Sequence, residues 1–171
     1  MGQASSLGVE ELRVIPVRPG ICYGLLGPVF LMFYRTAPEL SDLKARVPYL
    51  DELRDRPGKG AFLSVIDGEH AKAFPDHPSR LETKRQAQEY GPTVAAGSVV
   101  LEGGGVRESL IRSFVRGLLV FRRSPMPYRF FANVPEAVDH VLEGLERDGP
   151  GDHGALVAAV EILRARAATP E

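Results

Sequence analysis

Residues 61–66 read Ala-Phe-Leu-Ser-Val-Ile, a short and almost continuously apolar run between the loop 57–60 and the polar, turn-rich stretch 67–78. A run of this length without polar alternation is typical of a strand that is buried on both faces, as in a parallel sheet. Residues 93–101 have the same character, although Gly97 weakens the strand that they predict. Two such strands with room for a crossover helix between them predict an α/β fold.

Helices are predicted on both sides of the 61–66 strand. Before it, apolar residues recur at spacings of three and four, at Leu40, Leu43, Val47, Leu50 and Leu53. Pro48 lies inside this pattern, so we expect the helix to kink or break there. After the strand, Ser79 is followed three residues later by Glu82, which is the pattern of a capping box and predicts Ser79 as the helix N-cap.

The rest of the chain extends the alternation of strands and helices. Residues 9–17 and 21–26 predict an initial hairpin with Pro16 in an edge strand, and 29–34 continue it as a strand or a packed connection. Further on, 128–131 predict a last strand and 135–145 a helix. The sequence therefore predicts a mixed sheet of about five strands, an initial hairpin followed by parallel strands with crossover helices.

Three segments are predicted along the chain. Residues 1–8 form a flexible N-terminus, 9–146 form the α/β domain, and 147–171 form a linker and an amphipathic helix. The apolar residues of that helix are spaced for about two heptads, which is short for a coiled coil. We expect it to dock on its own domain, and pairing with a second copy in a homodimer stays open.

Composition excludes several classes of protein. The chain has 21 basic and 22 acidic residues, so it has no overall field that would attract nucleic acid. Its single cysteine, Cys22, excludes an internal disulfide and a cysteine-only metal site. No run of 18 apolar residues predicts a transmembrane helix. Arginine outnumbers lysine 17 to 4, as in GC-rich bacterial coding sequences, and the expected compartment is the cytoplasm.

Few residues suggest chemistry. Gly103, Gly104 and Gly105 precede a predicted helix and are a candidate anion-binding turn, but they lack the spacing of a nucleotide fingerprint. His70 and His77 share one polar loop without further ligands at metal-binding spacing, so no metal or cofactor is expected. No nucleophile motif occurs, and the sequence predicts a protein that is not an enzyme.

A basic stripe is the strongest candidate for a binding surface. Arg112 and Arg116 are four residues apart and Arg123 follows seven later, so the three share one face of the predicted helix 106–123. Such a face can receive an acidic partner helix or an anionic head group. A solvated face whose arginine stems cover apolar surface is the structural alternative.

The stretch 93–145 carries a family resemblance. A strand ending in Val99-Val100-Leu101-Glu102-Gly103 leads into a helix with Ser109-Leu110-Ile111-Arg112, and the strand Tyr128-Arg129-Phe130-Phe131 precedes Asn133-Val134-Pro135-Glu136-Ala137. This layout resembles the C-terminal half of divergent bacterial SpoIIAA-like proteins of the STAS (STAS/SEC14-like) fold. The resemblance implies a STAS-like domain that works in signalling or regulation.

The same resemblance implies a phosphorylatable hydroxyl in the segment 67–80. The usual Asp-x-Ser/Thr-Gly pattern is absent there, since the residues are Asp67-Gly68-Glu69-His70, and Ser79 is the candidate that remains. We therefore expect a non-enzymatic module that binds another protein through Arg112, Arg116 and Arg123. The SEC14-like side of the resemblance implies an alternative, a small-ligand or lipid-binding module with an apolar cleft. That cleft would be lined by Phe30, Met32, Phe33 and Phe114.

Overall fold

A computed structural model describes residues 6–68, 75–103, 128–147 and 149–168 of the chain. The strands are β1 (Arg13–Arg18), β2 (Ile21–Leu26), β3 (Val29–Tyr34), β4 (Gly60–Asp67), β5 (Val94–Glu102) and β6 (Tyr128–Phe131). The helices are α1 (Leu40–Ala45), α2 (Val47–Asp55), α3 (His77–Tyr90), α5 (Val134–Gly144) and α6 (Pro150–Ala168), with short 3₁₀ turns at Val9–Glu11 and Gly91–Thr93. None of the described helices has an apolar stretch long enough to cross a bilayer.

The six strands form one mixed sheet in the order β1-β2-β3-β4-β5-β6. β1, β2 and β3 pair antiparallel, whereas β3 to β6 are parallel to one another. The predicted α/β class, with an initial hairpin followed by parallel strands, is confirmed. The count of about five strands is too low by one, because Val29–Tyr34 is a full strand rather than a connection. Gly27, with φ of 53°, makes the tight turn that returns the chain into β3.

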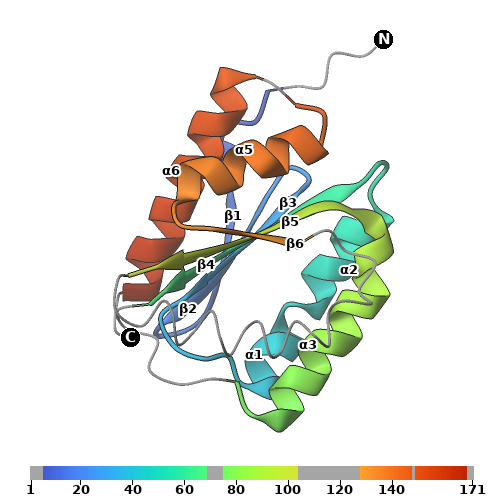
Figure 1. The fold of residues 1–171 in the computed structure, drawn as a ribbon, viewed down its shortest axis with the longest axis vertical. Helices are drawn as coiled ribbons and strands as arrows, with labels where there is room; N and C mark the ends of the chain where they lie inside the picture. The colour runs from blue at the N-terminus through green and yellow to red at the C-terminus, as the bar shows by residue number, and fades with distance from the viewer. Residues whose placement is uncertain (1–5, 69–74, 104–127, 148, 169–171) are drawn as a thin grey trace.

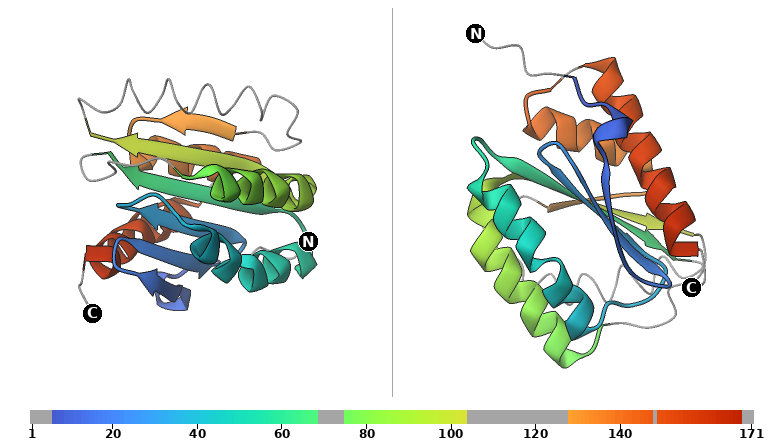
Figure 2. Two further views of the ribbon diagram at one scale, coloured as in Figure 1. Left: turned by 90° about the horizontal axis from the view of Figure 1, so that it is seen from below. Right: turned by 180° about the vertical axis from the view of Figure 1, so that it is seen from behind.

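Helices cover both faces of the sheet. α1, α2 and α3 lie on one side of the sheet and α5 and α6 on the other (Figure 1). The left view of Figure 2 shows the strands side by side in their order across the sheet. Side chains alternate between the two faces, so Phe30 and Met32 point to the α1–α3 side and Phe33 to the α5–α6 side. Two separate apolar clusters result, one on each face.

Pro48 breaks the predicted helix 40–53, as expected. α1 ends at Ala45, and α2 starts at Val47 with Pro48 in its first turn, where a proline costs no hydrogen bond. Arg46 is the residue between the two helices, and its side chain is only 8% exposed. Val47, which the apolar spacing places inward, is half-buried instead.

The start of α3 corrects the predicted cap. Asp76 is the N-cap, and its carboxylate accepts a hydrogen bond of 2.9 Å from the amide of Ser79. Ser79 therefore lies in the first helical turn rather than at the cap. An aspartate and a serine are both good caps, and the sequence contains one of each within four residues. His77 and Pro78 fill the first two helical positions, where proline is well tolerated.

The C-terminal helix packs on its own sheet. Leu156, Val160 and Leu163 of α6 belong to the same apolar cluster as β2, β3 and α5. Gly24 of β2 leaves space for this approach, because a Cβ atom there would lie 3.1 Å from the Leu163 side chain. The end of α6 is fastened to the hairpin by a hydrogen bond of 2.9 Å from the Gly20 amide to the Ala167 carbonyl.

Candidate functional site

Most of the sites predicted from sequence fall outside the described residues. The basic stripe of Arg112, Arg116 and Arg123 lies there, and so do Gly104, Gly105 and Phe114. Gly103 is described: it follows the last residue of β5 and has a φ of 99°, a conformation that favours glycine. The stripe and the anion-binding turn therefore stay predictions.

Ser79 is enclosed in the protein. Its side chain is 0% exposed, and its hydroxyl makes no hydrogen bond of good geometry to a described residue. The hydroxyl and the amide of Ser79 both lie beside the Asp76 carboxylate and lower its pKa, the hydroxyl contributing more. Phosphorylation of Ser79 stays a prediction, and it requires the first turn of α3 to open before a kinase can reach the hydroxyl.

One predicted pocket is wrong. Phe30 and Met32 lie under α1–α3, whereas Phe33 lies on the opposite face under Arg164 of α6, whose guanidinium carbon is 5.0 Å from the ring centroid. These three side chains cannot line one cleft, because residues an odd number apart in a strand point to opposite faces. Any apolar ligand must therefore lie on one side of the sheet alone.

The histidines and the cysteine offer no reacting constellation in the part of the chain that the structure describes. His77 is exposed at the start of α3, His70 lies outside the described residues, and no three His, Cys, Asp or Glu side chains gather among the described ones. Cys22 is 1% exposed, and burial raises the pKa of its thiol to about 11, which keeps it protonated and unreactive at neutral pH.

Ser98 and His140 are a described pair that resembles a nucleophile and its base. The Ser98 Oγ lies 2.9 Å from Nδ1 of His140 and donates to the Ala137 carbonyl at 3.0 Å. The Ser98 hydroxyl thus has two neighbours within hydrogen-bonding distance, and the tautomer of His140 determines whether Nδ1 donates or accepts. Ser98 is 1% exposed, so the pair fastens α5 to β5.

Arg46 is the centre of an unexpected polar cluster on the α1–α3 face. Its Nε donates to Oε1 of Gln86 in α3 at 2.7 Å. Its Nη1 donates to the Tyr34 hydroxyl at 3.0 Å and lies 3.0 Å from the Met32 sulfur, both in β3. The guanidinium therefore joins the α1–α2 junction, α3 and the sheet.

Both the amide nitrogen and the oxygen of Gln86 are engaged in hydrogen bonds. Its amide nitrogen donates to the Leu43 carbonyl at 2.9 Å and to Oε1 of Glu82 at 2.7 Å, while its oxygen accepts from Arg46. Hydrogen bonds from Arg85, and more weakly from Gln86, lower the pKa of Glu82 to about 2 although burial opposes the shift. Arg46 is thus connected to a carboxylate only through the neutral amide of Gln86.

Neutral phenols surround the Arg46 charge. Burial opposes the charge of Arg46, whereas the hydrogen bond to the Tyr34 hydroxyl favours it. Burial also raises the pKa of Tyr128 to about 12, and it raises the pKa of Tyr23 still further, so both hydroxyls are protonated at neutral pH. Arginine keeps its charge in proteins, and this face therefore contains a buried cation among uncharged groups.

Asp42, the acidic residue that precedes Arg46 by one helical turn, is paired with another arginine. Asp42 lies one turn before Arg46 and is also buried, but both of its oxygens accept from Nε of Arg18, at 3.1 and 3.0 Å. Tyr23 donates to the Asp42 carbonyl at 3.1 Å. Among the residues that the structure describes, none forms an ion pair with Arg46.

Sequence reasoning missed Arg46, although a signal was present. Arg46 lies three residues after Leu43 and four before Leu50, which are the spacings of the inward face of a helix. A charged residue at such a position indicates a buried polar contact. Its partner Gln86 lies forty residues further along the chain, so only the tertiary structure identifies it.

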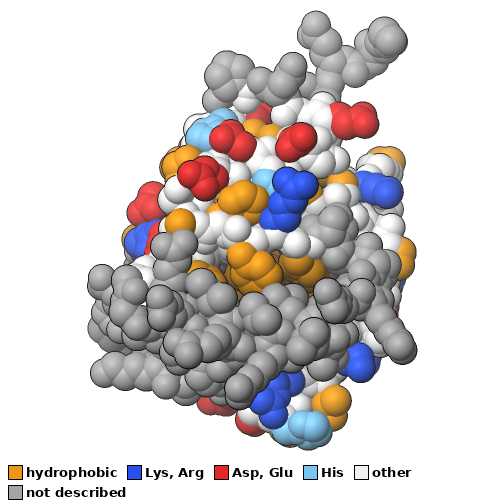
Figure 3. Space-filling view, in the orientation of Figure 1, with side chains coloured by type: hydrophobic (Ala, Val, Ile, Leu, Met, Phe, Trp, Pro, Cys, Tyr) orange, Lys and Arg blue, Asp and Glu red, His pale blue; other side chains and the backbone are white. Residues whose placement is uncertain are grey.

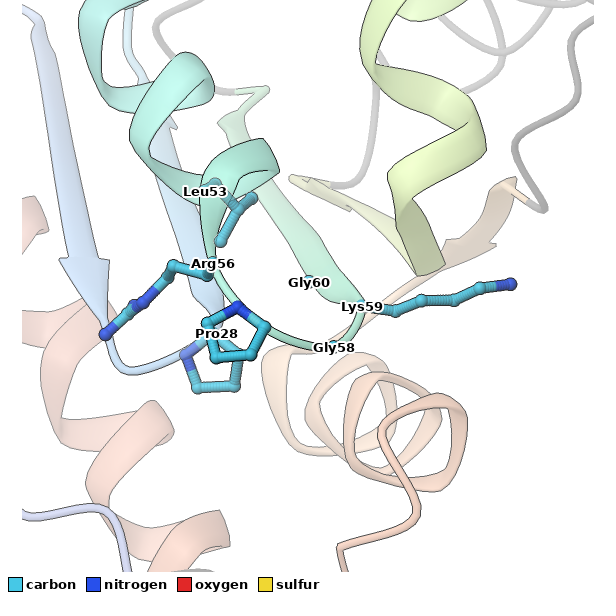
Figure 4. Close-up of a pocket in the computed structure, with 7 residues that line it drawn as sticks. Pro28, Leu53, Arg56, Gly58, Lys59 and Gly60 are labelled. Carbon is cyan, nitrogen blue, oxygen red and sulfur yellow. The ribbon is translucent and has the colours of Figure 1, made fainter.

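A shallow pocket occurs at the opposite end of the sheet. It has a volume of about 280 Å³ and is lined by Pro28, Leu53, Arg56, Pro57, Gly58, Lys59 and Gly60. Figure 4 shows that Lys59 points away from it and that Arg56 extends toward the β2–β3 turn. Arg56 donates there to the Gly27 carbonyl, so its side chain holds the β2–β3 turn.

The comparisons with known proteins concern the fold. No protein-family model matches the chain. A solved structure that is similar to it belongs to an uncharacterised protein of the DUF3478 family from Shewanella loihica PV-4, which is described as having a SpoIIAA-like fold. The two sequences are 13% identical, the match covers 82% of this chain and 99% of that one, and the TM-score is 0.46. The similarity assigns no ligand, partner or activity to this chain.

Proposed function

We propose that this protein is a non-enzymatic, STAS-like module that binds another protein in bacterial signalling or regulation. Its charge distribution carries the proposal. Residues 104–127 contain five arginines and one glutamate, a formal charge of +4, so the remainder of the chain carries −5. Such a concentration of one sign in a balanced chain suits an acidic protein partner.

The states of Cys22 and Ser98, two of the buried nucleophilic side chains that the structure describes, support a role in binding rather than catalysis. Cys22 is protonated and enclosed, and the hydroxyl of Ser98 donates to a main-chain carbonyl. Neither group can attack a bound molecule without local unfolding.

An acidic surface of the required kind occurs on the protein itself. Glu136, Asp139, Glu143 and Glu146 are exposed at spacings of three and four along and just after α5, and Figure 3 shows acidic side chains over the end of the molecule formed by α5 and α6. A second copy of the chain is therefore one partner with suitable chemistry. Native mass spectrometry at low and high salt would detect such a charge-dependent dimer.

Charge reversal tests the proposal. Arg112→Glu together with Arg116→Glu should abolish partner capture from a bacterial lysate and leave the thermal unfolding midpoint unchanged. The matched control is Lys59→Glu with Arg80→Glu, because both residues are exposed and the change in net charge is the same. Equal capture by the stripe variant and the wild type would contradict the proposal, and so would loss of capture in the control.

A second candidate function is the binding of a small ligand. One observation favours it: the buried guanidinium of Arg46 has no acidic partner among the described residues. A buried charge without a counter-charge is costly, and perturbed buried charges gather at functional sites. Native mass spectrometry of gently purified protein tests this candidate function. The expected result is a retained mass of about a few hundred daltons, the mass of a drug-sized ligand.

A further inference from the structure

The N-terminal strap, residues 6–12, is held on the domain at two neighbouring residues. Ser6 Oγ and the Leu7 amide both donate to Oδ1 of Asp152 in α6, at 3.1 and 2.6 Å. The Leu7 side chain is 7% exposed and belongs to the apolar cluster of the α5–α6 face. The other strap residues, all of them described, are half-buried or exposed. The right view of Figure 2 shows the 3₁₀ turn of the strap beside α6.

Two glycines make room for the strap. A Cβ atom at Gly27, in the β2–β3 turn, would overlap the Leu7 side chain. A Cβ atom at Gly151, in the first turn of α6, would lie 3.1 Å from Ser6 Oγ. The strap therefore lies on a surface that has no side chain at these two points, which we call the strap seat and define by Gly27, Gly151 and Asp152.

The seat offers a hydrogen-bond acceptor. The start of a helix attracts a negative charge, and at α6 the carboxylate of Asp152, which is 4% exposed, already supplies that charge. Its Oδ2 accepts from Nε of Arg147 at 2.7 Å, while Oδ1 faces the strap. An occupant of the seat must therefore bring N–H or O–H donors and an apolar side chain, since a further anion would be repelled.

The strap can leave its place while the sheet stays intact. None of its residues, which the structure describes throughout, belongs to a strand. The main-chain hydrogen bonds of its 3₁₀ turn join strap residues to one another. A segment with one buried apolar side chain and no strand pairing opens locally at a small part of the cost of global unfolding. The start of the strap is thus held by Asp152 and by the burial of Leu7.

We propose that the seat binds an extended segment of a partner protein, in which a hydroxyl residue precedes a leucine, and that the strap competes with this segment. The strap itself provides the mode of binding, because Ser6 and Leu7 fill the seat within the chain. The hydroxyl and the main-chain amide of the partner segment donate to Asp152, and its leucine packs at Gly27. The proposal uses no residue of the basic stripe, so its outcome is independent of the function proposed above.

An acetylated peptide with the strap sequence 6–12 is the probe, titrated into the full-length protein labelled with ¹⁵N. In the wild type the attached strap competes at a high effective concentration, so the peptide should bind weakly. In full-length Leu7→Ala this competitor is weakened. The peptide should then bind at least tenfold more tightly, one per chain, and shift the amide resonances of Gly27 and Gly151.

Leu81→Ala is the matched control, because it makes the same change at a leucine of α3 that is 54% exposed. Its affinity for the peptide should equal that of the wild type. Equal affinities of Leu7→Ala and Leu81→Ala would overturn the proposal, and so would binding that shifts neither glycine resonance.

Peptide variants test the chemistry of the occupant while the protein stays the same. A strap peptide with Leu7→Ala loses the apolar side chain, and one with Ser6→Asp places a second carboxylate beside Asp152. Each should bind the Leu7→Ala protein at least tenfold more weakly than the unchanged peptide. Binding of the Ser6→Asp peptide with undiminished affinity would contradict the role assigned to Asp152.

Hydrogen exchange in the wild type gives the answer if Leu7→Ala does not fold. Millimolar strap peptide should accelerate exchange of the Leu7 amide, because the displaced strap loses its bond to Asp152. An unchanged rate would overturn the proposal. A wild-type dimer in native mass spectrometry that Leu7→Ala converts to a monomer would also overturn it, since the strap of a second copy would then be the occupant.

Discussion

The two faces of the sheet bury different kinds of side chain. Under α5 and α6 the buried side chains are mainly leucine, valine and alanine, with Ser98 and Asp152 as the buried polar residues described there. Under α1, α2 and α3 the cluster contains three tyrosines, and of the six buried polar side chains among the described residues four lie on that side: Asp42, Arg46, Ser79 and Gln86. Apolar burial by itself stabilises a fold, whereas each buried polar group adds a desolvation cost that a partner must offset. The α1–α3 face therefore carries groups that stability alone does not require.

This difference predicts where the protein tolerates change. On the α5–α6 face, the cost of a substitution should follow the volume removed. On the α1–α3 face it should follow whether a buried donor or acceptor loses its partner. The three predictions that follow test this contrast, from the largest expected effect to the smallest.

Leu156→Ala on α6 should have the largest effect. The side chain is 0% exposed, and removing it leaves a cavity between α6 and the sheet. We expect the free energy of unfolding to fall by about 2–5 kcal/mol in urea denaturation. Ile162→Ala on the same helix is the control, because Ile162 is 37% exposed and its loss should cost under about 1 kcal/mol. Similar costs for the two variants would contradict the assignment of this face as the apolar core.

Gln86→Leu should lower the free energy of unfolding by about 1.5–3 kcal/mol, because Nε of Arg46 loses its acceptor. The double variant Arg46→Met with Gln86→Leu should be more stable than Gln86→Leu alone, since both partners are then apolar. The same denaturation series measures both. If the losses in free energy of unfolding from Arg46→Met and Gln86→Leu simply add, the two side chains are not energetically coupled. Substitution costs on both faces would then depend on the removed volume alone.

Asp152→Asn should have the smallest effect of the three, about 1 kcal/mol at neutral pH. Asp152 is the charged exception on the α5–α6 side: it accepts from Arg147 at 2.7 Å and from the Leu7 amide at 2.6 Å, which holds the N-terminal segment on α6. Burial opposes the charge, but Arg147, Leu7 and Ser6 outweigh it and lower the pKa of Asp152.

The pH dependence of this effect has a definite sign. A carboxylate whose pKa is lowered by folding stabilises the protein above its unfolded-state pKa of about 3.9, and the contribution is lost as the pH falls through the folded-state pKa. The stability difference between wild type and Asp152→Asn should therefore be constant near neutrality and shrink below about pH 4. Glu143→Gln, at an exposed glutamate of α5, is the control. A difference that grows on acidification would contradict the contribution assigned to Asp152.

The sequence by itself determined the class and order of the fold. Continuous apolar runs such as 61–66 lack a polar face, which is possible only for strands covered on both sides, and this required helices in two layers. Pro48 determined the break between α1 and α2, because a proline inside a helix removes a main-chain hydrogen bond and clashes with the preceding turn. These features depend on neighbours within a few residues, so they can be predicted locally.

The state of residues 29–34 and the N-cap of α3 could not be predicted, because the local sequence fits two structures equally well in each case. Val29–Tyr34 is apolar throughout, and periodicity does not distinguish a buried strand from another buried segment. Asp76 and Ser79 could each cap α3, and the way in which the helix enters the domain selected Asp76. The separation of Phe30 from Phe33 could have been inferred once the segment was known to be a strand, since their spacing is odd.

The tertiary structure alone decided the candidate site. Arg46 becomes a buried donor only because α3 brings Gln86 against it and β3 brings Tyr34 beneath it, from positions far apart in the chain. Burial of a long charged side chain depends on what is packed around it and on whether its hydrogen bonds are met, and neither quantity is a property of the residue or its neighbours. Local pattern therefore determined the layers of this protein, while the packing of distant segments determined which of its charges lies inside.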